Sequence, residues 1–120
     1  MEHTGRLCES DYRFMCIIWE NEPLSSMQLV KLCDDQLGWK KSTTFTMIRR
    51  MSEKGYVQNV DAVVRSLIPR TNVEKQESET FMAHTFDGSL PRFLVSFLGS
   101  KTISKSEAEE LKKLIDSHRE

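Results

Sequence analysis

The 120-residue sequence predicts a mainly α-helical fold with one small β-hairpin. Apolar residues recur at helical spacing in three segments before Gly55, two short apolar runs follow that glycine, and three more amphipathic segments follow residue 70. Helix, helix, helix, hairpin is the order of a winged helix-turn-helix. We therefore expect a winged helix-turn-helix DNA-binding domain over residues 1–70 and a three-helix dimerisation region over residues 71–120.

The first two predicted helices have clear boundaries. Residues 9–20 form the first, because apolar side chains recur there on one face. The second begins at Ser25, which forms a capping box with Gln28, and it stops at Gly38. The short break between these helices fits a helix-turn-helix.

The third predicted helix, residues 42–54, has two faces of different chemistry. At about 100° per residue, the core face consists of Thr44, Met47, Ile48 and Met51. The other face and its edge carry Ser42, Phe45, Thr46, Arg49 and Arg50. Hydroxyl, guanidinium and aromatic groups bind phosphates and base edges or touch thymine methyl groups in a major groove. The sequence therefore predicts a DNA recognition helix, and we expect Ser42 to cap it because only lysines precede it.

A basic outer face, taken alone, is more typical of a solvated surface helix. The charge distribution favours DNA instead. Residues 39–70 hold seven Lys or Arg and two acidic residues, a balance of +5, whereas residues 71–120 have a balance of −2. Because the whole chain has a net charge of only −1, this contrast indicates a DNA-facing half and a second half with another role.

The hairpin is the weakest predicted element. Its strands are residues 56–57 and 63–68, and no Asn-Gly or Asp-Gly turn between them fixes the register. Arg65 and Arg70 are the only nearby charges suited to phosphate. We expect this wing to add little affinity.

Three helix-start signals divide the region after residue 70. They are the Thr71–Glu74 capping box, the cap Ser89 and the Ser104–Glu107 capping box. Helices this short are marginal alone, so they either fold back on the winged domain or dimerise. We expect a homodimer, because a repressor that reads two half-sites needs a second copy. The apolar residues predicted to form the dimer contact are Leu90, Phe93, Leu94, Phe97, Leu98, Leu111, Leu114 and Ile115.

Composition argues against several other classes of protein. Three cysteines without metal-ligand spacing predict reduced thiols, no metal and no cofactor. No apolar run reaches the roughly 18 residues needed to span a membrane, so we expect no membrane insertion and a cytoplasmic location. Candidates for a nucleophile or base are Cys8, Cys16, Cys33, His3, His84 and His118. None stands in a catalytic spacing, so the sequence predicts a protein that is not an enzyme.

Several motifs, in order along the chain, resemble one family of repressors. They are Ser10-Asp11, Met15, Ile18-Trp19-Glu20, Trp39, Thr43, Thr46, Arg50, Lys54-Gly55, Phe86-Asp87-Gly88-Ser89-Leu90, Ser104 and Glu107-Ala108-Glu109-Glu110-Leu111. Each is weak alone, but together they span almost the whole chain. The chain resembles the penicillinase repressor family, which includes methicillin-resistance and copper-transport repressors. The resemblance implies a homodimeric winged-helix repressor that binds palindromic double-stranded operator DNA and controls resistance genes, often for β-lactam antibiotics.

The resemblance also points to individual residues. Thr43, Thr46 and Arg50 match helix positions that contact DNA in relatives. The chain departs from the family at Phe45, where a polar or basic residue is usual, and at Ser42, where many relatives have Lys. Taken with the helix faces, the predicted DNA-binding residues are Lys41, Ser42, Thr43, Phe45, Thr46, Arg49, Arg50, Lys54 and Arg65.

Family branches differ in how repression is relieved. The copper branch binds metal through Cys-x-Cys motifs near the C-terminus, and this chain has no cysteine after Cys33. In the β-lactam branch the resemblance implies cleavage between an Asn and a Phe within the dimerisation helices, and the equivalent bond here joins Ser96 and Phe97. A membrane sensor protease pathway would then be a partner. The alternative function is a winged-helix protein-interaction module without sequence-specific DNA binding. The weak turn signal of the wing and its lack of the usual Gly-Arg tip favour this alternative.

Overall fold

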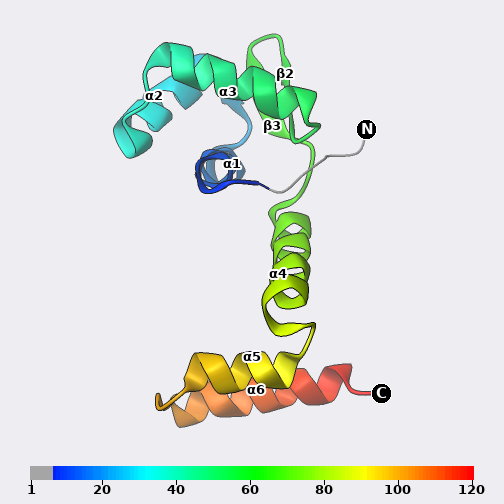
Figure 1. Cartoon of the computed structure of the whole chain (residues 1–120). Helices are drawn as coiled ribbons and strands as arrows, with labels where there is room; N and C mark the ends of the chain where they lie inside the picture. Colours follow the sequence, from blue (N-terminus) through cyan, green and yellow to red (C-terminus); the bar gives the residue numbers. More distant parts are fainter. Residues whose placement is uncertain (1–6) are drawn as a thin grey trace. The chain divides into compact units, whose positions relative to one another are not determined.

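The computed structural model describes residues 7–120 (Figure 1). His3, considered above for catalysis, lies outside the described residues. The chain forms two compact units, Met1–Ser78 and Glu79–Glu120. In chain order the elements are α1 Glu9–Asn21, β1 Leu24–Ser25, α2 Ser26–Leu37, α3 Lys41–Glu53, β2 Val57–Val60, β3 Val63–Ser66, α4 Arg70–Phe86, α5 Leu90–Leu98 and α6 Lys105–His118. The predicted fold class, mainly α with a small β-hairpin, is confirmed.

The first unit builds its core from α1, α2, α3 and the small sheet. Phe14 and Ile18 of α1 and Leu29 of α2 are completely buried, and Phe14 stacks on Trp39 with ring centroids 5.9 Å apart. The predicted core face of the third helix is also buried, which confirms that prediction: Thr44, Met47, Ile48 and Met51. Because these residues anchor one side of α3, the opposite side of the helix is fixed toward solvent.

A third strand completes the sheet, which has the antiparallel order β1-β3-β2. The sequence did not predict β1, whose two residues pair as Leu24 with Val64 and Ser25 with Val63. Two residues are too short to show the apolar alternation that marks a strand. The strand ties the connection between α1 and α2 to the hairpin.

The hairpin turn consists of Asp61 and Ala62, both at positive φ (52° and 60°). Positive φ at both central residues is the signature of a type I′ turn, which matches the twist of the flanking strands. Its register is defined, with Val60 opposite Val63, although no glycine marks it. The backbone N–H of Ser26 donates to the Ala62 carbonyl at 2.9 Å, so α2 holds the tip in place.

Most helix-start predictions are confirmed, and two are wrong. Ser25 and Gln28 form both bonds of a capping box, and Ser89 and Ser104 each accept a backbone N–H. Ser104 and Glu107 form this one bond of the predicted capping box. Ser42 is not the cap of α3: the extended N-cap residue is Lys40, without a side-chain cap bond. The start is set by the tight connection after α2, in which the Trp39 N–H donates to the Cys33 carbonyl.

Thr71 is likewise not a cap, because α4 already begins at Arg70. The carbonyl of Pro69 accepts the backbone N–H groups of Asn72 and Val73, so the helix starts directly after the proline. The fixed φ of proline suits this position at a helix start. Glu74 instead pairs with Arg70 one turn away, at 3.9 Å.

In the second unit an aromatic cluster joins the end of α4 to α5. Phe93 contacts Phe81, Phe86 and Phe97, with ring centroids 6.2, 5.5 and 5.6 Å away. No residue of α5 or α6 is buried. Within residues 7–120, no helix combines the length and apolar character needed to cross a membrane.

Candidate nucleic-acid interface

Four side chains of α3 form a central row along its solvent side. They are Ser42, Thr46, Arg49 and Glu53, spaced i, i+4, i+7 and i+11, and all are exposed. This spacing keeps them on one line of the helix, opposite the buried core face. Glu53 was missing from the predicted set, although its helical spacing alone places it on this row.

An aromatic side chain stands on one flank of this row. Phe45 is 37 % exposed, and the Lys41 ammonium lies 6.0 Å from the centre of its ring. The two residues are one turn apart near the start of α3, where backbone N–H groups carry positive partial charge. A cation, an apolar ring and a helix N-terminus therefore meet at this end.

The other flank carries Thr43, Arg50 and Lys54 and faces α1. The Lys54 Nζ lies 3.5 Å and the Arg50 Nη2 3.6 Å from Oδ2 of Asp11. Asp11 is only 1 % exposed. Two of the cations predicted to bind DNA are therefore also partners of a buried carboxylate.

The wing supplies one predicted residue, Arg65. It is exposed on β3 and pairs across the hairpin with Gln58 of β2. The tip itself carries an acidic side chain, Asp61, and no basic one. Seven of the nine predicted DNA-binding residues thus lie in α3 and Lys54 is its C-cap residue, while Arg65 stands on a separate element.

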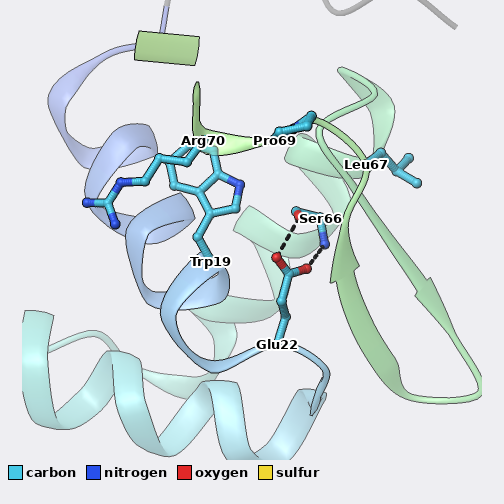
Figure 2. A pocket seen from close by; sticks show the side chains of 6 residues that line it. All are labelled: Trp19, Glu22, Ser66, Leu67, Pro69 and Arg70. Atoms are coloured by element: carbon cyan, nitrogen blue, oxygen red, sulfur yellow. Dashed lines mark hydrogen bonds between the residues drawn. The ribbon is translucent and has the colours of Figure 1, made fainter. Parts of the chain in front are cut away.

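A shallow hollow of about 430 Å³ is a second candidate site (Figure 2). It is lined by Trp19, Glu22, Ser66, Leu67, Pro69 and Arg70. Figure 2 shows the Glu22 carboxylate turned toward Ser66, whose backbone N–H and hydroxyl donate to it at 2.6 and 2.8 Å. Both carboxylate oxygens of Glu22 therefore already have partners.

The polar side chains of Trp19 and Arg70 also have partners. The indole N–H of Trp19 donates to the Ile68 carbonyl at 3.0 Å, and the Arg70 guanidinium lies 5.8 Å from the Trp19 ring centre. Arg70 also pairs with Glu20 at 3.7 Å. These contacts fix the segment between β3 and α4 against α1. We interpret the hollow as a structural joint rather than a ligand site.

The candidate catalytic residues are dispersed. Cys33 is buried, and burial raises the pKa of its thiol, so it is a poor nucleophile. Cys16 lies 3.6 Å from Arg70, and Cys8 lies 3.3 Å from the Ser10 hydroxyl. His84 and His118 stand in α4 and α6. No hydrogen bond joins a cysteine to a histidine anywhere in residues 7–120.

Comparison with known proteins identifies the family. The model of the penicillinase repressor family matches residues 7–117. The chain belongs to the penicillinase repressor family. It is 23 % identical to the methicillin resistance regulatory protein MecI of Staphylococcus aureus strain Mu50, over 94 % of this chain and 95 % of the relative. It is 21 % identical to the penicillinase repressor of Bacillus licheniformis, over 99 % and 96 % of the two chains. The resemblance inferred from the motifs is thereby confirmed.

A solved structure agrees with the fold. The monomeric form of Bacillus licheniformis BlaI, in complex with the blaP half-operator, matches with a TM-score of 0.50 at 18 % identity. The match covers 60 % of this chain and 93 % of that structure. It supports the winged-helix fold, and membership of a family of repressors supports a DNA-binding repressor rather than an enzyme.

Proposed function

We propose that this chain is a homodimeric transcriptional repressor that binds palindromic operator DNA through α3. The observation that carries this proposal is the solvent side of α3. Its core face is buried, so three members of the central row, Ser42, Thr46 and Arg49, are held outward on a rigid element. A rigid helix with hydroxyl and guanidinium groups fits the width of a major groove.

Six exposed side chains of α3 have roles suited to their chemistry. Lys41, at the helix start, and Arg49, on the central row, would neutralise phosphates. The hydroxyls of Ser42, Thr43 and Thr46 can bond to phosphates or base edges. The ring of Phe45 would contact a thymine methyl group. Arg65 on the wing would contact only the phosphate backbone of DNA. The acidic side chain at the tip of the wing, Asp61, would disfavour closer contact.

Exposed apolar surface in the second unit supports dimerisation. Leu90, Phe97, Leu111, Leu114 and Ile115 are each more than a third exposed, while Phe93, Leu94 and Leu98 are only partly buried. Apolar surface on this scale within one small helical region is typical of an interaction site. A second copy of the chain would cover it and would place two copies of α3 on two half-sites.

Control of β-lactam resistance-type genes, with relief by proteolysis, completes the proposal. It is supported by relatives named for methicillin resistance and penicillinase repression. The candidate bond between Ser96 and Phe97 lies within α5, and both residues are exposed in the single chain. Helical backbone does not fit a protease cleft, so α5 would have to unfold locally before the bond could be cut. The protease would belong to a membrane sensor pathway.

The wing favours the alternative function, a protein-interaction module without sequence-specific DNA binding. Its two-residue turn is bonded to α2, and its tip is acidic. Such a module would bind any duplex equally weakly. Selection of sequences from a random pool separates the two functions.

Selection from randomised duplex DNA with the full chain tests the proposed function. The expected result is a palindromic motif whose binding weakens steeply with salt. Thr46→Glu should lower affinity for the selected duplex about 10- to 100-fold, because it places a negative charge in the groove. Thr71→Glu is the matched control: Thr71 is exposed on α4, and its substitution should leave affinity within about twofold. No enriched motif, or equal losses for the two variants, would contradict the proposal.

A further inference from the structure

Asp11 is a buried carboxylate whose two oxygens differ in their partners. Its Oδ2 lies 3.5 Å from the Lys54 Nζ and 3.6 Å from the Arg50 Nη2, while its Oδ1 is buried and bonds to nothing within residues 7–120. A buried carboxylate is costly unless cations compensate it. Arg50 and Lys54 therefore compensate the buried charge of Asp11, and this pairing competes with any contact that they make to a ligand.

Two adjacent arginines of α3 consequently differ in their surroundings. Arg49 stands on the central row, and no carboxylate within residues 7–120 forms an ion pair with it. Arg50 is half-exposed on the flank that faces α1 and is turned toward Asp11. The two side chains have the same charge and length, so any difference in their roles comes from their positions on the helix.

We propose that Asp11 is a positioning residue for the DNA interface, which holds Arg50 and Lys54 against α1 and leaves Arg49 as the arginine of α3 that is free to contact DNA. The role assigned to Asp11 rests on the proposed DNA-binding function. The pairing fixes the C-terminal half of α3 to α1 by two cations one turn apart. It also withdraws two charges from sequence-independent phosphate binding. Specificity rises when this general attraction is kept small relative to base contacts.

A matched pair of variants tests this division in the full chain. Each phosphate contact contributes about 0.9 to the slope of log K against log salt concentration. Arg49→Gln should reduce the magnitude of the slope by about 0.9, whereas Arg50→Gln should reduce it by less than half as much. The probe is the selected duplex, titrated between about 50 and 200 mM salt. An equal or larger reduction for Arg50→Gln would overturn the role of Asp11.

Removal of the Asp11 carboxylate should strengthen non-specific DNA binding, which is the opposite of the effect expected for the arginine substitutions. Asp11→Asn frees Arg50 and Lys54, so binding to a random-sequence duplex should strengthen about threefold or more and its salt slope should steepen. The ratio of specific to non-specific affinity should fall. A variant that merely loosened the fold would weaken both kinds of binding. Glu9→Gln, an exposed change of equal charge on the same helix, is the control and should show a smaller gain.

The outcomes distinguish this role from the function on which it rests. Failure to select any sequence would contradict the proposed function and the role of Asp11 with it. A selected sequence combined with no gain in Asp11→Asn, or a gain equal to that of Glu9→Gln, would overturn only the role of Asp11. Where thermal melting shows that Asp11→Asn is unfolded, the two arginine variants decide.

Discussion

Leu114→Asp is expected to convert the proposed homodimer to a monomer and to lower its affinity for a palindromic duplex about 100-fold or more. Leu114 is 56 % exposed on α6. A dimer would bury it twice, once in each copy, and burial of one leucine side chain stabilises by about 1.5–3 kcal/mol. A charge at the same place would add a desolvation cost. Sedimentation and DNA titration measure the two effects.

Val95→Asp is the matched control for this prediction. Val95 is the most exposed apolar residue of α5, at 75 %. It is not among the residues of this helix that are predicted to meet the second copy, which are Leu90, Phe93, Leu94, Phe97 and Leu98. Its substitution should leave the dimer and its DNA affinity unchanged. A dimeric Leu114→Asp, or equal losses in both variants, would show that the dimer uses another surface.

Cleavage between Ser96 and Phe97 should have an effect of similar size. It would release α6 and the end of α5, and with them Leu111, Leu114 and Ile115. At about 25 cal/mol per Å², loss of several hundred Å² of apolar contact costs several kcal/mol of dimerisation energy. The separated winged domains would then bind one half-site each, about 10²- to 10⁴-fold more weakly than the linked pair.

Mass spectrometry of the repressor from cells exposed to a β-lactam measures cleavage between Ser96 and Phe97 directly. We expect fragments that end at residue 96 and begin at residue 97, with an uncut chain in untreated cells as the control. An intact chain during full induction would contradict proteolytic relief. It would leave DNA binding and dimerisation untouched, because both depend on the uncut chain.

Sequence patterns were sufficient to predict the elements that repeat over several turns. The alternation of core and solvent sides in α3 predicted which residues are buried, because four apolar or small side chains recur at one helical spacing. The capping box at Ser25 and the terminating Gly38, with φ 69°, were also predictable, since each depends on a local hydrogen bond or backbone angle. Local physics was enough in these places.

Features that depend on distant residues were not predictable. Asp11 resembles an ordinary acidic residue in the first turn of a helix, and its pairing with Arg50 and Lys54 appears only when α1 packs beside α3. The turn at Asp61 and Ala62 lacks the glycine that marks such turns, and its register is set partly by the bond from Ser26. Tertiary contacts decided both features.

The mass of the complex on the selected duplex, measured by native mass spectrometry with the full chain, tests the central claim most directly. A dimeric repressor that reads two half-sites should give two chains on one palindromic duplex. A duplex with one half-site scrambled should bind at least about 100-fold more weakly. One chain on each duplex, or equal binding to intact and scrambled duplexes, would contradict the account.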